Sequence, residues 1–462
     1  MRGLRRRLVA LACTATAGAM ILTGCLNNPN QGGGGAPGGG GEGIADNAEA
    51  DGDGVVTILG AFGGQEQEGF LASLEEFEAE SGITIQYTAD QDFTNTIRLR
   101  TNSGQAPDIA IFPQPGGLLE LAEEGYIQPI DTYLDFDALD RTLVPGFLES
   151  ARMNGRVYGA PMRMAVKSIV WYPAEAYEAG GYNTEPADLD ELDAVAEEIK
   201  ADGITPWCMG WGSDQTTGWV GTDWIEEYML RLWGPDVYDQ WTSHEIPFDD
   251  ERVVAAFDAY GELLQTEGNV LGGPSGVLST PFSDAMLPAF DDPPKCMLER
   301  QGNFVTGFLP DDVQADLDNQ VGLFVFPRAA DSEYDGQPIM GGGDIAALMN
   351  GNDPDAIAVM EFITSDQFGG EWASAGGWLS PHTTFDASQY ADEITRQTAE
   401  IVAAADVFRF DGSDLMPNAV GGGTFWTGMV EWLRGDKTAE EVTAEIERTW
   451  PTDDEAEDES ES

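Results

Sequence analysis

The sequence predicts an α/β protein built from two lobes, and three observations support this prediction. From residue 55 onward, strand-like apolar runs alternate with amphipathic segments, a rhythm typical of a largely parallel sheet with helices on both faces. Without its two ends the chain still has about 400 residues, which is too many for one hydrophobic core and suits two lobes of about 150 to 200 residues each. Near residue 156 the alternation gives way to an extended stretch, where we expect the chain to cross into the second lobe.

The first lobe is expected over residues 55–162 and opens with a βαβ pattern. A strand over 55–59 leads into a helix over 66–80, which a glycine ends. In such sheets a ligand binds beyond the carboxyl ends of strands, so the loops 62–66 and 113–116 are expected beside a ligand. Further strands and helices are expected to alternate in the order 83–87, 94–102, 108–112 and 117–124.

The rest of the chain is predicted to form the second lobe and to return to the first. Residues 163–338 are assigned to the second lobe, 339–380 to the first lobe again, and 381–450 to a helical part mainly of the second lobe or the hinge. The expected elements are an extended stretch over 165–172, helices over 189–202, 225–233 and 252–266, and strands over 295–298 and 322–326.

Two glycine-rich stretches in this part are predicted to be irregular. Residues 205–224 are expected to form a loop, and residues 341–344 are expected to interrupt the chain as a glycine loop. A helix with clear start signals follows the second stretch, with Asp353 as N-cap and Pro354 as the first helical residue.

Tryptophan is concentrated in the first of these stretches. Trp207, Trp211, Trp219 and Trp224 fall within eighteen residues, among Gly, Ser, Thr and Asp. Such a tryptophan can cap an edge of the core, or it can present an apolar face to an amphipathic ligand. A sugar ring is such a ligand, because its C–H faces stack on indole while its hydroxyls meet polar side chains.

The two ends of the chain have features of an exported lipoprotein. Four arginines precede a mostly apolar run over 8–22, which has the length of a signal-peptide core and is short of a membrane span. Small residues then precede Cys25, so residues 1–24 are expected to be a lipoprotein signal peptide and Cys25 the lipidated residue. The alternative is a plain secretory signal with an incidental cysteine. Residues 25–54 should then be the lipidated cysteine and a flexible tether, and 451–462 an acidic disordered tail.

The charge balance excludes some partners. The chain has 22 basic and 82 acidic residues, which give a formal net charge of −60. Such a surface repels nucleic acid and anionic lipid, and it disfavours an anionic ligand unless a local basic pocket overrides the field. The alternative interpretation is a solvated acidic surface with no direct functional meaning.

Cysteine and histidine usage indicates a disulfide rather than a metal site. Cys13 lies in the predicted signal peptide, and Cys25 is the predicted lipidated residue. Two cysteines are then left, Cys208 and Cys296, and in an oxidising compartment a disulfide between them is the simplest explanation. The only histidines, His244 and His382, neighbour neither a cysteine nor each other in sequence, so no metal or cofactor is expected.

The sequence contains no clear catalytic motif. Carboxylates are so abundant that the pair a glycosidase needs cannot be selected from sequence. There is no Gly-x-Ser-x-Gly elbow, no phosphate-binding P-loop and no histidine-rich set of metal ligands.

Two tryptophan-bearing segments carry a family resemblance. At 206–211 and 218–226 the chain resembles the extracellular solute-binding lipoproteins of carbohydrate ABC importers, and within them the α-glucoside-binding branch. The resemblance covers about residues 55 to 435. Further agreeing segments are 170–173, 296–304, 342–346, 409–417 and 421–426.

This resemblance implies a periplasmic-binding-protein-like fold of the class II type, with a hinge of crossing segments and a ligand cleft between the lobes. A neutral carbohydrate such as maltose, trehalose or sucrose would be captured and delivered to an ABC permease without chemical change. The protein is therefore expected to be a lipid-anchored monomer at the extracellular face of the cytoplasmic membrane, and not an enzyme. The alternatives are a secreted glycan-active lipoprotein enzyme and a receptor for another solute such as a polyol.

The resemblance also implies a set of ligand-binding residues. Glu66 and Gln114 lie in the loops after the first and third strands, and Phe304 stands where many relatives have tryptophan, so the stacking face would be smaller. Cys208 and Cys296 match a pair that looks like the disulfide of the branch. The other ligand-binding candidates are Trp171, Trp211, Thr217, Trp219, Asp223, Arg300, Gly342, Gly343, Asp344 and Trp378.

Overall fold

The computed structural model describes residues 52–332, 334–349 and 351–451. The predicted signal peptide, the lipidation of Cys25, most of the tether and nearly all of the acidic tail therefore lie outside the described residues. Within the described ranges, none of the helices is long and apolar enough to cross a membrane.

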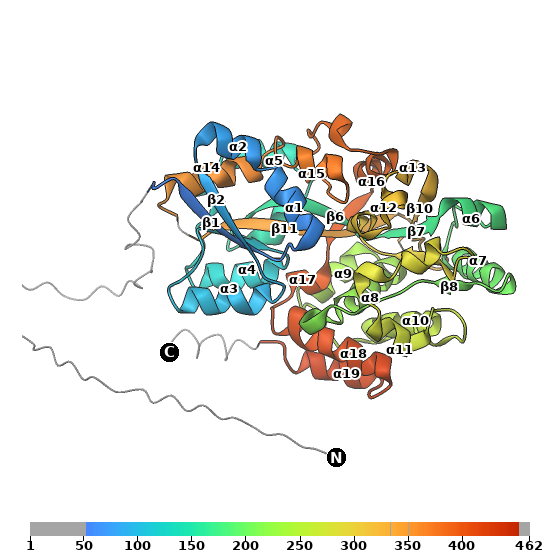
Figure 1. The fold of residues 1–462 in the computed structure, drawn as a ribbon. Helices are drawn as coiled ribbons and strands as arrows, with labels where there is room; N and C mark the ends of the chain where they lie inside the picture. The colour runs from blue at the N-terminus through green and yellow to red at the C-terminus, as the bar shows by residue number, and fades with distance from the viewer. Residues whose placement is uncertain (1–51, 333, 350, 452–462) are drawn as a thin grey trace, which may run out of the picture. The chain divides into compact units, whose positions relative to one another are not determined.

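Two principal β-sheets organise the described chain (Figure 1). The larger, six-stranded sheet has the order β12-β11-β3-β1-β2, and β6 also pairs with β11. Strand β1 is parallel to β2 and β3, as the βαβ rhythm predicts, whereas β11 runs antiparallel to β3 and β6 and parallel to β12. These strands are β1 (Val55–Gly60), β2 (Thr84–Ala89), β3 (Ile109–Phe112), β6 (Ala160–Val166), β11 (Pro338–Leu348) and β12 (Val407–Phe410).

Helices cover both faces of the larger sheet. Helices α3 and α4 lie on one side of it and α14 on the other (Figure 1), which explains why β3 is buried along its whole length. A two-stranded hairpin of β4 (Arg152–Met153) and β5 (Arg156–Val157) precedes β6. The helices are α1 (Gly64–Ala72), α2 (Glu75–Ser81), α3 (Phe93–Asn102), α4 (Pro115–Glu123), α5 (Phe136–Thr142), α14 (Pro354–Ile363) and α15 (Gly370–Ala375). We call this sheet with these helices the first lobe.

The smaller, four-stranded sheet has the order β10-β7-β9-β8. Its strands are β7 (Ile169–Pro173), β8 (Thr205–Trp207), β9 (Cys296–Arg300) and β10 (Val321–Val325). Its helices are α6 (Ala174–Gly180), α7 (Leu189–Ala201), α8 (Trp219–Trp233), α9 (Pro235–Thr242), α10 (Glu251–Gln265), α11 (Gly273–Ser279), α12 (Asp311–Gln314) and α13 (Leu317–Gln320). We call this sheet with these helices the second lobe.

The C-terminal helices reach several parts of this fold. Helix α16 (Glu393–Ala404) packs against β10 and α13, and α17 (Gly412–Leu415) packs against both α4 and α8. Helices α18 (Trp426–Arg434) and α19 (Ala439–Glu447) pack on the second lobe, where α18 contacts α8 and α19 contacts α10.

The predicted disulfide is confirmed. Cys208 directly follows β8 and Cys296 begins β9, and these two strands are parallel neighbours. The two Cα atoms are 5.3 Å apart, and the bond closes a sequence separation of 88 residues. It therefore fastens together two strands of the second lobe that are distant in sequence.

Within the described residues the chain passes between the two lobes at three places. It leaves the larger sheet between β6 and β7 through Lys167 and Ser168, returns between β10 and β11, and leaves again after β12 toward α18. The backbone N–H groups of Lys167 and Ser168 both donate to the carbonyl of Met340, at 2.8 and 3.3 Å. Met340 lies on β11, which follows the second crossing, so the first two crossings are hydrogen-bonded to each other. The exact lobe limits predicted from the sequence stay a prediction.

The glycine loop predicted at 341–344 is wrong. These residues form the middle of β11, where they pair with β6. Glycine is needed because β6 approaches closely: a Cβ at Gly341 would lie 2.2 Å from the carbonyl oxygen of Ala165, and one at Gly343 would lie 2.3 Å from that of Arg163.

Two helix predictions also need correction. The helix predicted over 66–80 is broken into α1 and α2, because the buried hydroxyl of Ser73 donates to the carbonyl of Gly69 and accepts from the N–H of Trp372. Helix α8 begins at Trp219, six residues before the predicted start at 225, so Trp219 and Trp224 lie on a helix and not in a loop.

Candidate functional site

A cavity of about 770 Å³ is lined by residues of both lobes. Its first-lobe side comes from the loops that follow β1, β2 and β3, the position where open sheets with parallel strands bind ligands. Its second-lobe side comes from the start of α8 and from two 3₁₀ turns, Phe282–Asp284 and Asn303–Phe308. We call this cavity the cleft.

The first-lobe wall of the cleft is polar and is organised around Arg163 on β6. The guanidinium donates to the carboxylate of Glu66 and, at 2.6 Å, to that of Asp344. It also lies over the rings of Phe62 and Trp372, 4.7 and 5.2 Å from their centroids. Burial alone would lower the pKa of Arg163, but the two carboxylates outweigh it and raise the pKa, so this cation is held in ion pairs.

The second-lobe wall carries most of the aromatic rings of the cleft. Trp219, Phe282, Phe304 and Phe308 line the cleft and contact one another, and we call them the aromatic quartet. Trp219 meets Phe282 edge to face at 5.1 Å between ring centroids, and Phe282 meets Phe308 in the same way at 5.6 Å. All four rings are half-buried, so each keeps part of its surface open. Edge-to-face contacts fix the ring orientations and leave a preformed apolar surface.

Lys167 brings a second cation into the cleft at the first crossing between the lobes. Its ammonium donates to the carboxylate of Asp223 at 3.0 Å and to that of Asp411, and it lies 5.2 Å from the ring centroid of Trp219. Burial alone would lower the pKa of Lys167, but the surrounding carboxylates, including that of Asp414, outweigh it and raise the pKa.

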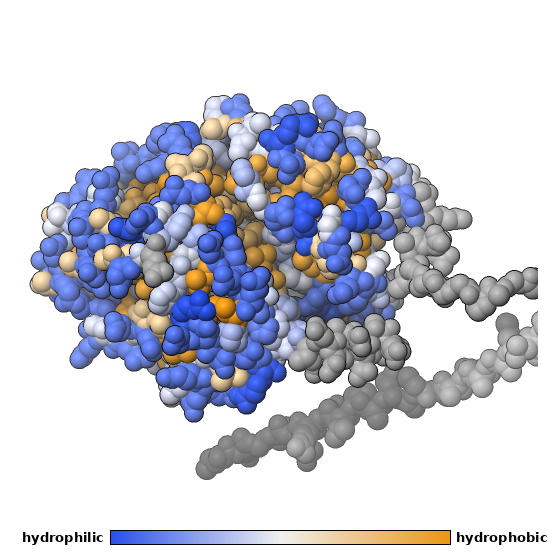
Figure 2. Space-filling view, turned by 180° about the vertical axis from the view of Figure 1, so that it is seen from behind, coloured by the Kyte–Doolittle hydropathy of each residue, from blue (hydrophilic) through white to orange (hydrophobic). Residues whose placement is uncertain are grey.

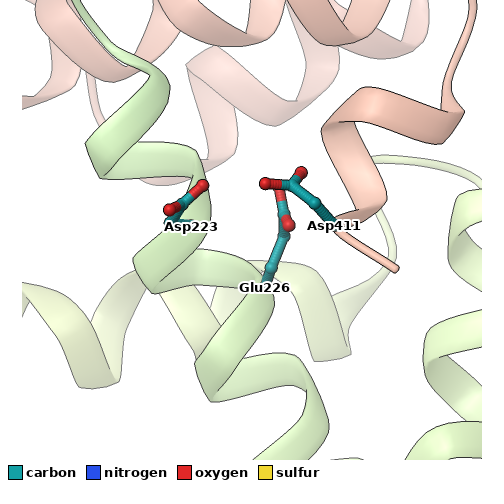
Figure 3. Close-up of side chains that lie close together, drawn as sticks. All are labelled: Asp223, Glu226 and Asp411. Carbon is teal, nitrogen blue, oxygen red and sulfur yellow. The ribbon is translucent and has the colours of Figure 1, made fainter. Parts of the chain in front are cut away.

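Three carboxyl groups gather beside this ammonium, and we call them the carboxyl cluster. Figure 3 shows Asp223 and Glu226 on neighbouring turns of α8, with Asp411 opposite them on the segment that follows β12. One oxygen of each lies within 4.8 Å of the others, and all three side chains are buried. Glu226 also accepts from the backbone N–H groups of Gly412 and Ser413, at 2.8 and 3.0 Å, which ties α8 to the third crossing.

Three carboxyl groups could bind a hard metal cation such as Ca²⁺ or Mg²⁺. In this protein, however, the ammonium of Lys167 already occupies the position beside them. Lys167 donates to two of the three carboxyl groups, so a metal ion there would have to displace or face its ammonium. Burial raises the pKa of Asp223 to about 8 and that of Glu226 well above its usual range, and the carboxylate of Asp411 adds to both. Burial would raise the pKa of Asp411 too, but Lys167 outweighs it and holds that pKa low. The cluster therefore contains one firm ion pair, between Lys167 and Asp411, and two carboxyl groups on α8 that ionise less readily than usual.

A family model for bacterial extracellular solute-binding proteins matches residues 63–369. The chain belongs to this family. This membership confirms the predicted family, and a lobed fold with a ligand cleft is what its members need to enclose a solute.

Two curated relatives cover nearly the whole described chain. This solute-binding protein is 43% identical over 396 residues to the osmoprotective compounds-binding protein GgtB of Synechocystis sp., covering 86% of this chain and 92% of the relative. It is 34% identical over 403 residues to the alpha-glucosides-binding periplasmic protein AglE of Rhizobium meliloti, covering 86% of each. These relatives are binding proteins rather than enzymes.

Solved structures support the fold. A chitin oligosaccharide binding protein superposes with a TM-score of 0.72, covering 85% of this chain and 97% of that one. Its sequence is 18% identical, so the likeness concerns the fold alone. The predicted periplasmic-binding-protein-like fold of two domains is confirmed.

The cleft of this solute-binding protein brings together most of the residues predicted to bind ligand. They come from five separate parts of the chain: the start of α1, the loop after β3, helix α8, the 3₁₀ turn after β9, and the middle of β11. The predicted residues that line the cleft are Glu66, Gln114, Trp219, Asp223, Phe304, Gly342, Gly343 and Asp344.

Three predicted tryptophans lie in the core instead. Trp171 on β7 is fully buried, and its indole N–H donates to the carbonyl of Gln301 at 2.8 Å. Trp211 is fully buried beneath α8, where Gly221 leaves room for its ring, and Trp378 is buried in the first lobe. None of the three lines the cleft, so we do not propose them as ligand contacts.

Two predicted polar contacts have structural partners. Arg300 is buried in the second lobe, where it pairs with Glu227 at 2.9 Å. The hydroxyl of Thr217 accepts from the N–H of Ser213 at 3.0 Å and shapes the loop before α8. Neither lines the cleft.

Sequence reasoning missed several residues that line the cleft. Arg163 and Lys167 stand alone in an otherwise apolar stretch, and a lone cation in such a stretch is a signal that could have found them. Phe282 and Phe308 carry no comparable signal, because nothing in their local sequence distinguishes them from core phenylalanines.

Proposed function

We propose that this solute-binding protein captures a neutral carbohydrate of the α-glucoside class in its cleft. It serves as the solute-binding component of an ABC sugar importer and delivers the sugar to the permease. The observation that carries the proposal is that an aromatic quartet and a polar wall line one cavity. A sugar ring needs both, because its C–H faces stack on aromatic rings while its hydroxyls exchange hydrogen bonds with polar groups.

The names of the relatives support this class of ligand. AglE is named for α-glucosides and GgtB for osmoprotective compounds, and both cover most of this chain. The charge of the cleft agrees with a neutral ligand, because among the described residues that line it the two cations, Arg163 and Lys167, are both engaged in ion pairs with carboxylates.

Binding is coupled to closure of the cleft and involves no chemistry. A ligand drives closure only by contacting the closed form better than the open form, and here the two kinds of contact belong to different lobes. A sugar held by both lobes therefore favours the closed form. No bond of the sugar is made or broken, and the protein is a receptor rather than an enzyme.

The protein works as a monomer at the extracellular face of the cytoplasmic membrane. Cys25 carries the lipid anchor, and the tether after it allows the binding part to reach the permease. The anchor can be tested by substituting Cys25 with serine, which should release the protein from the membrane fraction into the medium.

Calorimetry with maltose, trehalose and sucrose tests the ligand class. We expect saturable heat for at least one of the three, and no monosaccharide in the mixture after prolonged incubation. Release of monosaccharide at catalytic rates would establish the glycan-active enzyme instead. Heat with a polyol but with none of the disaccharides would favour the receptor for another solute.

A further inference from the structure

Lys167 has an unusual position for a charged residue. It is one of four lysines in the chain, it lies in the short link between β6 and β7, and its side chain lines the cleft. The backbone N–H bonds of Lys167 and Ser168 to Met340 fix the link against β11. The backbone that carries the Lys167 side chain is therefore held in place by hydrogen bonds to β11.

The ammonium retains one hydrogen-bond donor. A lysine ammonium has three N–H donors. Within the described residues two of them are used, toward Asp223 Oδ1 at 3.0 Å and toward Asp411 Oδ2. The side chain borders the cleft, so the third donor is available to a ligand oxygen.

An unused acceptor lies next to this donor. Oδ2 of Asp223 is buried and has no hydrogen-bond partner among the described residues, and Asp223 also lines the cleft. A buried polar atom without a partner costs free energy that a ligand group can recover. Because this oxygen is buried, the carboxyl group must turn partly about its terminal torsion, which has a broad range in aspartate, for the oxygen to meet a ligand in the cleft.

The two unused groups lie beside the aromatic quartet. The ammonium is 5.2 Å from the ring centroid of Trp219, and Asp223 is one helical turn after Trp219 on α8. A ligand that contacts Trp219 therefore comes next to both groups. Only a group that accepts from an ammonium and donates to a carboxylate satisfies both, and an alcohol hydroxyl does this.

We propose that Lys167 and Asp223 form a clamp for one hydroxyl group of the ligand beside Trp219, with Lys167 donating to the hydroxyl oxygen and the ionised carboxylate of Asp223 accepting its hydrogen. This inference rests on the proposed function, since it assigns a contact within the same cleft. It makes Lys167 a specificity-determining residue rather than only a member of a buried ion pair.

Substitution of the two clamp residues tests the proposal. Lys167→Met removes the donor at nearly constant length, and Asp223→Asn is nearly isosteric and removes the carboxylate. Affinity is measured by calorimetry for whichever of maltose, trehalose and sucrose the unmodified protein binds. We expect each variant to lose at least tenfold in affinity.

Folding must be separated from binding, because Lys167→Met leaves buried carboxyl groups without their cation. The double variant Lys167→Met, Asp411→Asn removes one of those charges and is compared with the single variants by circular dichroism and thermal melting. Lys200→Met is the matched control, since Lys200 is also a partly buried, ion-paired lysine but lies on α7 outside the cleft. It should bind as the unmodified protein does.

The outcomes distinguish the two proposals. If the unmodified protein binds none of the three sugars, the proposed ligand class fails and the clamp fails with it. If it binds one of them and a folded Asp223→Asn or Lys167→Met, Asp411→Asn variant binds equally well, only the clamp is overturned and Lys167 has a structural role alone.

Discussion

The two walls of the cleft are built by different means. The first-lobe wall consists of polar loops at the carboxyl ends of parallel strands, stiffened by Arg163 between two carboxylates. The second-lobe wall presents four aromatic rings on short turns and the start of a helix, together with polar side chains that include Asp223. Burial of aromatic surface contributes a hydrophobic free energy that is non-directional, whereas buried polar groups discriminate strongly because an unmatched group is costly. We therefore expect the aromatic quartet to supply most of the affinity, and the polar groups, above all those of the first-lobe wall, to supply most of the selectivity.

Most of the surface shown in Figure 2 is hydrophilic, and hydrophobic residues occupy smaller areas between the hydrophilic ones. Against this hydrophilic surface, the aromatic quartet in the cleft indicates a binding site, because soluble proteins rarely expose a cluster of large apolar side chains that has no ligand or partner.

Loss of the disulfide should have the largest effect on stability and should leave the comparison of the walls intact. In Cys208→Ser, Cys296→Ser the unfolded chain gains the freedom of a long loop, which is expected to cost about 4 kcal/mol of unfolding free energy. Both positions lie outside the cleft, so the sugar affinity of the folded protein should stay unchanged. Denaturant unfolding with and without sugar measures both quantities. A loss of affinity in the folded variant would show that the second-lobe wall depends on this bond.

Trp219→Ala should have the largest effect on binding. Removal of this ring opens the aromatic quartet, and the expected loss of affinity is about 2 kcal/mol, or roughly thirtyfold. Trp233→Ala is the matched control, since Trp233 is a half-buried tryptophan at the other end of α8 and does not line the cleft. Unchanged affinity in folded Trp219→Ala would remove this residue from the site.

Glu66→Gln should have a smaller effect that depends on the sugar. It weakens the ion pair with Arg163 and exchanges a carboxylate acceptor for an amide, so we expect a loss of about 1 kcal/mol in affinity. The loss should differ between maltose, trehalose and sucrose, because the polar wall discriminates hydroxyl positions. Glu149→Gln, which alters the exposed pair with Arg152, is the control. An equal loss for every sugar would contradict the assignment of selectivity to the first lobe.

A last prediction concerns stability alone and is a dependence of the melting temperature on pH. Burial raises the pKa of Asp223 to about 8, with Lys167 opposing the rise and Asp411 adding to it. The folded state then binds a proton that the unfolded state has released, so this contribution is present below the ordinary pKa of 3.8 and is lost as the pH rises through about 8. The melting temperature should therefore be higher near about pH 5.5 than near about pH 8.5.

Asp223→Asn should flatten this dependence, whereas Asp284→Asn, an exposed residue at the rim of the cleft, should leave it unchanged. Comparison at low and high salt separates the local effect from the repulsion within the strongly acidic chain, because salt screens exposed charges more than buried ones. An identical pH dependence in Asp223→Asn would show that this group does not hold the proton.

The sequence predicted correctly those helices and strands whose formation depends on residues that are close together in the chain. The helix that starts at Pro354 forms with Asp353 accepting from the N–H of Asp355 at its N-terminus, because a cap needs only residues that are neighbours in sequence. The first three strands and the helix predicted over 94–102 lie within a few residues of their predicted positions, whereas the helix predicted over 66–80 is divided into α1 and α2.

Glycine-rich segments were misinterpreted, because the reason for a glycine can lie far away in the chain. The glycines of β11 serve the close approach of β6, and Gly221 within α8 makes room for the ring of Trp211. Both look like loop residues from their composition alone. The same limit applies to the site: the ammonium of Lys167 meets Asp411, a residue 244 positions away, and no local pattern announces such a pair.

Because the chain has only four lysines, it can be attached to a biosensor chip through its amines in a controlled way. Among the lysines, Lys167 is enclosed by its carboxylate partners with 9% of its side chain exposed, whereas Lys295 exposes 63%. Reagents that attack primary amines should therefore modify Lys295 first and spare Lys167. Lys295 does not border the cleft, so molecules immobilised through it on a biosensor chip should present a uniform orientation with their binding face open to injected solutes.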